Sequence, residues 1–85
     1  MIQPLLEYDE AADAAYISFS ETEWHHQVRL DDGRAVNYAQ DGSVIGAELL
    51  SPRRKGVILD GLPHAEDIAR VIRAVRFRVP EPLPE

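Results

Sequence analysis

The sequence predicts an α+β fold, a four- or five-stranded antiparallel β-meander with one C-terminal amphipathic helix packed on one face. Three observations predict it. Short apolar runs separated by turn residues fill the first fifty positions, two Asp-Gly pairs lie between the last three runs, and apolar residues at helical spacing follow Pro63. Asp-Gly is a strong hairpin signal, and apolar residues every three or four positions indicate a helix.

The chain length allows one small domain, since 85 residues bury only about 60% of the surface that the unfolded chain exposes. We expect this domain to span residues 1–79 and the Pro-rich residues 80–85 to fray. No apolar run approaches the roughly 18 residues that cross a bilayer, and the N-terminus does not resemble a secretory signal. The absence of cysteine excludes disulfides and thiolate sites, so we expect a cytoplasmic protein. We expect no cofactor.

Five runs in the first half of the chain are expected to form strands. Asp9 and Asp13 suit a turn between the first two runs, because Asp side chains bond to their own backbone. The second run has apolar residues on both faces, which is typical of a central strand. The runs are Leu5–Tyr8, Ala14–Ser20, Gln27–Leu30, Ala35–Tyr38 and Val44–Leu50.

Side-chain alternation selects the register of both hairpins. A three-residue loop at 31–33, with Gly33 in the left-handed region, places Val28 opposite Val36 and keeps the apolar side chains on one face. At Asp41-Gly42 a two-residue loop pairs Tyr38 with Ile45, and we expect Gly42 to have a positive φ. The face expected under the helix consists of Val28, Leu30, Val36, Tyr38, Ile45 and Leu49. The apolar residues left over require a cover on the other face, so we expect a homodimer. The alternative is that residues 57–59 and the C-terminal segment wrap under the sheet and complete the core.

The second half of the chain predicts a helix with Pro63 near its first position and its end near Arg76. Residues 51–56 are expected as a polar loop and residues 57–60 as a strand or a buried connector. Phe77 and Val79 are expected to be extended and to point inward. The helix face expected in the core consists of Ala65, Ile68, Val71, Ile72 and Val75.

The charge is distributed unevenly. Residues 1–50 hold ten acids and two arginines, a net charge of −8, whereas residues 51–85 hold five acids and seven bases, a net charge of +2. The net negative charge of residues 1–50 argues against nucleic acid as a ligand, because phosphate binding requires a clustered basic face. Arginines near a helix C-terminus complement the helix dipole, which accounts for part of the basic segment.

Two segments resemble a bacterial family known as domain of unknown function 2283. The first is Tyr8-Asp9-Glu10-Ala11-Ala12-Asp13-Ala14-Ala15-Tyr16-Ile17, and the second runs from Val36-Asn37-Tyr38 through Asp41-Gly42 to Leu50. Ala15, Asn37 and Ala39 depart from the usual residues. The resemblance implies a small β-rich domain without an assigned activity. Members often occur beside small toxin-like proteins, which implies an antitoxin role as a hypothesis.

The run Trp24-His25-His26, with Glu21 and Glu23 before it, is the most conspicuous polar cluster. In a strand Glu21, Glu23 and His25 would share one face, where carboxylates and an imidazole suit a metal ion. His25 and His26 would then point to opposite faces. No recognised ligand spacing is present, so we favour a polar loop in which Trp24 covers the sheet edge or the core.

No catalytic motif is present, so we predict a non-catalytic protein-interaction module rather than an enzyme. Its expected partner is a second copy or a small basic toxin-like protein, which would make it antitoxin-like. Neither nucleic acid nor a membrane is expected as a partner. The alternative is a small-ligand or metal-binding protein, or a weak enzyme, that uses Glu21, Glu23, His25 and the Tyr8–Asp9 turn. The residues expected at the interaction surface are Trp24, Arg53, Arg54 and Phe77.

Overall fold

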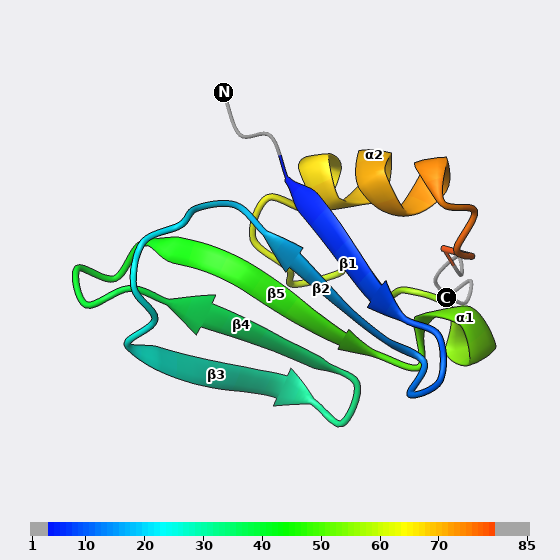
Figure 1. Ribbon diagram of the computed structural model, residues 1–85, viewed down its shortest axis with the longest axis horizontal. Coiled ribbons are helices and arrows are strands. Elements are labelled where there is room, and N and C mark those ends of the chain that lie inside the picture. The colour runs from blue at the N-terminus through cyan, green and yellow to red at the C-terminus, as the bar shows by residue number, and fades with distance from the viewer. Residues whose placement is uncertain (1–3, 80–85) are drawn as a thin grey trace, which may run out of the picture.

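In the computed structural model, which describes residues 4–79, five antiparallel strands form one sheet and a C-terminal helix packs on one face (Figure 1). The predicted α+β class is confirmed, and the predicted tail at 80–85 lies outside the described residues. No helix within residues 4–79 is long and apolar enough to cross a membrane. The elements are β1 (Leu5–Asp9), β2 (Ala14–Ser18), β3 (His26–Asp31), β4 (Arg34–Tyr38), β5 (Val44–Leu50), α1 (Pro52–Lys55) and α2 (Ala65–Ala74).

The strand order in the sheet is β1-β2-β5-β4-β3, so the predicted meander order holds for β1 and β2 and for β3, β4 and β5, but β2 and β3 are not neighbours. β2 pairs with β5 rather than with β3, and Ala15 and Ile17 lie opposite Leu49 and Ala47. The segment from residue 19 to residue 25 therefore crosses from the middle of the sheet to its far edge. This pairing joins the β1–β2 hairpin to the three-stranded meander and makes β2 and β5 interior strands.

Both hairpins have the predicted register along most of their length, but their loops differ from prediction. Val28 lies opposite Val36, and Val36 lies opposite Ala47, as expected. A β-bulge at Leu30 leaves Asp31 opposite Arg34, so the first loop has two residues instead of three. A second bulge leaves Tyr38 opposite Val44 rather than Ile45, and the predicted Tyr38–Ile45 pair is wrong. A bulge inserts one extra residue into one strand. Each bulge therefore changes the loop length, while the strand pairs on the side away from the loop keep the predicted register.

The glycines of the two turns differ in conformation. Gly42 has a φ of 88°, as predicted for a left-handed turn residue. The predicted positive φ of Gly33 is wrong, because Gly33 is not among the positive-φ residues of the described chain. Its N–H instead donates to Oδ1 of Asp31 at 2.9 Å, so this carboxylate closes the short turn.

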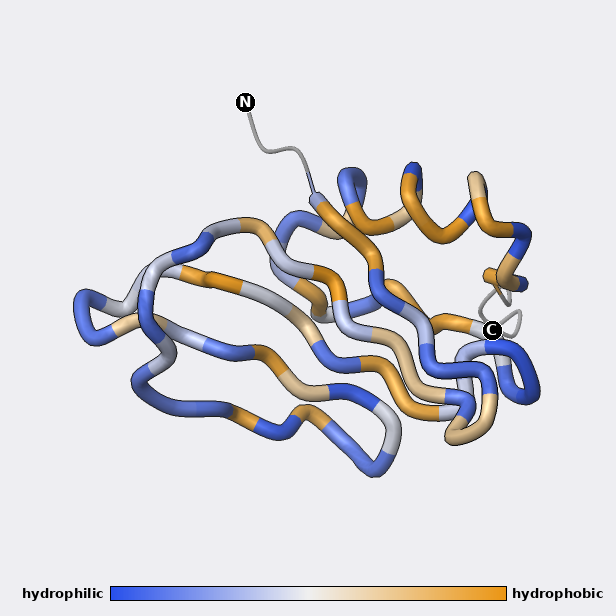
Figure 2. The backbone as a smooth tube through the Cα atoms, in the orientation of Figure 1, coloured by the Kyte–Doolittle hydropathy of each residue, from blue (hydrophilic) through white to orange (hydrophobic). Residues whose placement is uncertain are grey.

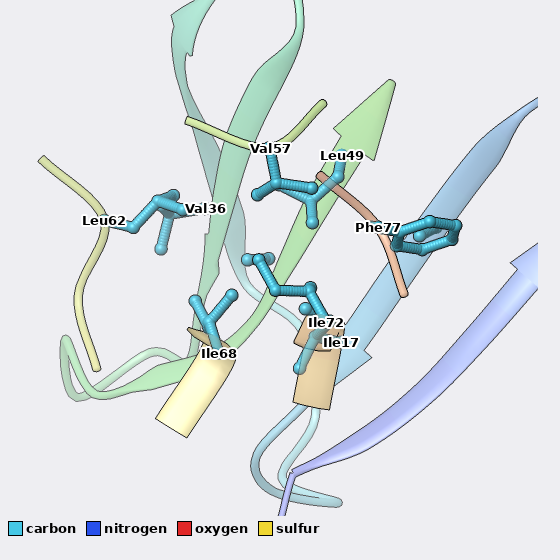
Figure 3. Packing of buried hydrophobic residues seen from close by; sticks show 10 residues of the cluster. Ile17, Val36, Leu49, Val57, Leu62, Ile68, Ile72 and Phe77 are labelled. Carbon is cyan, nitrogen blue, oxygen red and sulfur yellow. The ribbon is translucent and has the colours of Figure 1, made fainter. Parts of the chain in front are cut away.

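The core lies between the sheet and α2, where the apolar residues gather in Figure 2. Figure 3 shows Ile68 and Ile72 of α2 facing Ile17, Val36 and Leu49 of the sheet. Phe77 is buried, and Val79 packs against the cluster, so both point inward as predicted. The other buried members of the cluster are Ala15, Ala47, Val57 and Leu62.

α2 covers less of the sheet than predicted. Val28 is 44% exposed and Leu30 is 38% exposed, so the expectation that both lie under the helix is wrong. A ten-residue helix is only about 15 Å long. In Figure 1 it lies away from β3, which forms the opposite edge of the sheet.

The helix begins and ends at residues with a left-handed backbone. His64 has a φ of 54° and precedes α2, so Pro63 lies before the helix rather than at its first position. At the other end Arg76 has a φ of 64°, its N–H donates to the Arg73 carbonyl, and Phe77 N–H donates to the Ile72 carbonyl. This pattern is a Schellman motif. Val75 lies at the C-cap and is 42% exposed, so its predicted place in the core is wrong.

The connection between β5 and α2 is ordered by hydrogen bonds. Residues 52–55 form the one-turn helix α1, where a polar loop was predicted. Residues 57–60 are a connector without strand pairing, in which Val57 N–H donates to the Arg78 carbonyl at 2.7 Å. The Arg34 guanidinium donates to the carbonyls of Ile58 and Asp60 and thereby fixes the connector to β4.

Candidate functional site

The first family-like segment forms a bonded corner at one end of the sheet. Tyr8 Oη donates to Asp13 Oδ1 at 2.8 Å across the β1–β2 turn. The Ser51 N–H donates to the Asp13 carbonyl at 2.7 Å, which brings the end of β5 to the same place. The Arg53 guanidinium carbon lies 5.4 Å from the centre of the Tyr8 ring, a cation–π distance. We refer to Tyr8, Asp13, Ser51 and Arg53 as the corner.

Asp13 also caps helix α1 from forty residues away. The N–H groups of Arg53 and Arg54 each donate to its carboxylate at 3.1 Å. A residue at the N-cap usually provides this acceptor, but Ser51 occupies that place and makes no side-chain cap bond. Tyr8 and Asp13 therefore link the β1–β2 turn to the end of β5 and to the start of α1. These hydrogen bonds support a structural role for the two residues.

The corner shifts two ionisation equilibria in opposite directions. Burial raises the pKa of the Tyr8 hydroxyl above its ordinary value of 10.0, and the bond to the Asp13 carboxylate raises it further. Burial also acts to raise the pKa of Asp13. The hydrogen bonds from Tyr8, Arg53 and Arg54 outweigh burial and hold the pKa of Asp13 below 3.8. Asp13 is therefore an anion at neutral pH, and Tyr8 remains a hydrogen-bond donor.

The candidate metal cluster of the alternative interpretation does not assemble in the described part of the chain, where no group of three metal-ligating side chains is brought together. Glu21, Glu23 and His25 are all exposed and lie before β3 rather than in a strand. His25 and His26 do not point to opposite faces as expected. Their Nδ1 atoms lie 2.9 Å apart, because His25 is outside the strand and its ring turns toward its neighbour.

The face of the sheet opposite α2 carries a row of polar side chains and also two exposed apolar ones, Leu5 and Leu50, which are 62% and 37% exposed. Cross-strand pairs share a face, and Gln27, Asn37, Gly46 and Ser18 form one row across β3, β4, β5 and β2. Gln27 Nε2 donates to Asn37 Oδ1 at 2.8 Å, and Asn37 Nδ2 donates to Tyr16 Oη at 3.1 Å. We refer to this side of the sheet as the open face.

Gly46 explains how Tyr16 lies in this row. A Cβ atom at Gly46 would overlap the Tyr16 hydroxyl and would lie 2.9 Å from the Ile17 carbonyl oxygen. The missing side chain therefore lets the phenol lie across β5 and reach Asn37. A glycine inside a strand often marks such a close approach.

The open face contains a shallow hollow of about 410 Å3 over β1, β2 and β5. The register places Glu7, Tyr16 and Glu48 in one line, with Asp9 in the adjacent line. Arg29 Nη2 lies 3.4 Å from Glu48 Oε1 at the far side of this line. Ala14 and Leu50 add apolar surface. We refer to Glu7, Asp9, Tyr16, Glu48 and Leu50 as the acidic hollow.

The four residues predicted for an interaction surface lie in three different environments. Trp24 is 57% exposed, so it does not lie in the core. Arg53 and Arg54 are exposed, but their backbone N–H groups are bonded in the corner. Phe77 is buried, with its ring centre 5.0 Å from that of Tyr8. The structure does not bring these four residues into one surface.

Sequence reasoning missed the acidic hollow and the polar row. Glu7 and Asp9 lie two residues apart in one strand, as do Glu48 and Leu50 in another, so the members of each pair share a face of the sheet. The sequence did not predict that β2 pairs with β5, and this pairing brings Tyr16 opposite Glu48. Gly46 within an apolar run was a usable signal of a close approach.

Comparison with known families identifies the chain. The family model described as "Protein of unknown function (DUF2283)" matches residues 6–51, more than half of the 85 residues, so the chain belongs to this family. The predicted resemblance is thereby confirmed. The matched range includes the Tyr8–Asp13 turn, all five strands but the first residue of β1, and Ser51 of the corner. Neither a curated protein nor a solved structure matches the chain.

Proposed function

We propose that the protein is a non-catalytic interaction module whose acidic hollow binds an arginine- or lysine-rich segment of a basic protein. The observation that supports this proposal most directly is the register of β1, β2 and β5, which lines carboxylates of Glu7, Asp9 and Glu48 around Tyr16. A cationic side chain entering the hollow would meet carboxylates at its rim. Its methylene groups would meet the ring of Tyr16 and the side chain of Leu50.

The distribution of charge supports a basic partner. Residues 1–50 have a net charge of −8, and they contain all five strands. Complementary potentials accelerate encounter and suppress binding to wrong partners, and this effect weakens as salt increases. Figure 2 shows hydrophilic residues in the turns between β3 and β4 and between β4 and β5.

The specific form that we propose is an antitoxin-like protein that binds a small basic toxin-like partner. This proposal rests on the acidic strand region and on what the family resemblance implies. A small domain with a net negative charge would bind a basic surface through complementary charge and shape. It would block that surface without a catalytic step. The natural test is purification of the tagged chain from its native host with identification of a basic protein that accompanies it.

A sharper test uses a defined probe, a synthetic arginine-rich peptide titrated calorimetrically into the protein. The triple variant Glu7→Gln, Asp9→Asn, Glu48→Gln retains the shape of the hollow and removes its charge. We expect it to bind the peptide at least about tenfold more weakly, which corresponds to about 1.4 kcal/mol. The affinity of the parent should also fall as salt is raised.

The matched control removes three carboxylates elsewhere, with Glu21→Gln, Glu23→Gln and Asp32→Asn. These residues are exposed and none of them lines the hollow. Because both triple variants change the net charge by the same amount, the control separates a localised site from general attraction. Equal losses of affinity in the two variants would contradict the proposed site.

A second candidate function, metal or small-ligand binding, is favoured by one observation, the two imidazoles whose Nδ1 atoms lie 2.9 Å apart. Imidazole is a common ligand of Zn²⁺. A metal that binds only the folded state raises the melting temperature. If this candidate function is correct, Zn²⁺ will raise the melting temperature of the parent and will not do so in the His25→Ala variant. An unchanged parent would exclude Zn²⁺ binding at this pair.

A further inference from the structure

β3 is an edge strand whose outer side is uncovered by the rest of residues 4–79. It pairs with β4 alone, and each of its six residues is exposed. In Figure 1 no described element lies beyond it. An edge strand presents backbone N–H and C=O groups that have no partner in the sheet, and it can pair with another strand.

β3 has few of the features that protect sheet edges. Within His26–Asp31 there is no lysine and no proline. Its one cation, Arg29, is bonded within its own chain, to Glu48 at 3.4 Å and to the Asp31 carbonyl at 3.0 Å. The bulge at Leu30 disturbs only the end of the strand. The part from His26 to Arg29 therefore remains regular and available for pairing.

Three of the seven large apolar side chains that are exposed within residues 4–79 lie in β3 or just before it. Val28 is 44% exposed and Leu30 is 38% exposed, and Trp24, just before the strand, is 57% exposed. The opposite edge differs, because β1 carries the carboxylates of Glu7 and Asp9. Two β1 strands placed side by side would bring like charges together, which is unfavourable.

The sequence of β3 is complementary to itself in the register centred on Val28. A two-fold axis perpendicular to the sheet, passing beside Val28, places Val28 against Val28 of the partner subunit. Gln27 then faces Arg29 of the partner subunit, and no like charges lie opposite each other. An axis beside Arg29 would instead oppose two guanidinium groups, which disfavours that register.

We propose that two copies of the chain pair antiparallel through β3 around Val28 and form a continuous ten-stranded sheet. This surface lies at the opposite edge of the sheet from β1, which contributes to the acidic hollow, so the dimer does not depend on the proposed function. One pair of six-residue strands buries less than the roughly 1,200 Å2 of a standard interface. The dimer is therefore expected to dissociate on dilution.

The absence of cysteine permits a direct test by cross-linking. In the proposed register two Val28→Cys side chains lie directly opposite, at a Cβ separation of about 4.5–5.5 Å, close to the range of a disulfide. We expect mild oxidation to convert Val28→Cys into a covalent dimer. The control Leu5→Cys, on β1 and 62% exposed, should remain largely monomeric.

Sedimentation equilibrium tests the same dimer without a covalent bond. The parent should change from monomer to dimer with rising concentration, while the emission of Trp24 shifts to shorter wavelength. Val28→Lys should raise the dissociation constant at least about tenfold, because it opposes two ammonium groups, and Leu5→Lys should not. Circular dichroism of each variant confirms folding. A parent that stays monomeric at millimolar concentration, with equal cross-linking of the two cysteine variants, would overturn the proposal.

Discussion

Asp13 connects more of the chain than any other side chain in the corner. Its backbone has a φ of 49°, its carbonyl accepts from Ser51, and its carboxylate accepts from Tyr8, Arg53 and Arg54. A short polar side chain adopts the left-handed region more readily than a branched or long one. The turn, the end of β5 and the start of α1 therefore depend on one residue.

Acid should destabilise the protein through Asp13. Its pKa in the folded state lies below the ordinary value of 3.8, so the unfolded state binds more protons in this range. The stability contributed by the carboxylate is present above pH 3.8 and is lost as the pH falls through the folded-state value. Asp31, bonded to Arg34, and Asp41, bonded to Ser43, have pKa values shifted in the same direction.

The variant Asp13→Asn tests this assignment. We expect a lower melting temperature at pH 7, since an amide cannot accept the charge-assisted bonds of a carboxylate. The difference between variant and parent should begin to shrink below pH 3.8 and should disappear once the pH falls below the folded-state pKa of Asp13, where the parent carboxyl is also neutral. A melting temperature that differs equally at pH 7 and pH 2.5 would show that the charge of Asp13 does not stabilise the corner.

Gly46→Ala tests the packing of Tyr16 on the open face. The new Cβ would overlap the Tyr16 hydroxyl and crowd the Ile17 carbonyl, so we expect a loss of about 1–3 kcal/mol in the free energy of unfolding. The control is Gly33→Ala, where the nearest atom would lie 3.7 Å away and φ is not positive. Urea denaturation of both variants measures the difference. Equal stabilities would mean that Tyr16 does not lie over Gly46.

At the scale of elements, α2 is held by its buried face and by the hydrogen bonds at its C-terminal end. The buried face consists of Ile68, Ala69 and Ile72, and the Schellman motif fixes Phe77 beside it. Arginine at the left-handed C′ position is an uncommon choice, because a Cβ raises the energy of this conformation. The basic residue does suit the negative end of the helix dipole.

Replacing Arg76 by glycine should stabilise the protein by up to about 1 kcal/mol, since glycine adopts a φ of 64° without a steric penalty. Arg73→Gly, inside the helix, should have the opposite effect by a similar amount. Thermal melting followed by circular dichroism checks both. A destabilised Arg76→Gly variant would indicate that the arginine side chain contributes more than the backbone conformation costs.

Truncation of Ile72 should strongly destabilise the protein. Its side chain is fully buried, so Ile72→Ala should lower the free energy of unfolding by about 2–5 kcal/mol. A total stability near the low end of about 5–15 kcal/mol would leave part of the population unfolded. Val75→Ala, at a position 42% exposed, should change stability by less than about 0.5 kcal/mol. Similar denaturant midpoints for the two variants would contradict the observed packing.

The alternation of apolar residues predicted the strands and most of each hairpin register, because a one-residue slip would turn Val36 away from the core. It did not predict loop lengths, since the bulges at Leu30 and Ile45 absorb one residue each. Turn signals are local, so they could not show that β2 pairs with β5 across twenty-five intervening residues. The acidic hollow depends on that pairing and was therefore missed.

At the scale of the whole molecule, the two proposed interaction surfaces lie at different parts of one sheet. The acidic hollow occupies the open face over β1, β2 and β5, whereas the dimer edge is β3. Pairing through β3 would place one hollow in each half of a continuous sheet. A dimer could then bind two basic segments at once, which raises the avidity for a partner that is itself dimeric.

The most direct measurement of the proposed function is an NMR titration of the ¹⁵N-labelled protein with the arginine-rich peptide. We predict that the amide signals of Glu7, Tyr16, Glu48 and their strand neighbours shift and saturate together, while signals of α2 stay in place. The Glu7→Gln, Asp9→Asn, Glu48→Gln variant should lose these shifts. Shifts confined to other acidic segments, such as Glu21–Glu23, or spread evenly over the surface, would contradict binding in the acidic hollow.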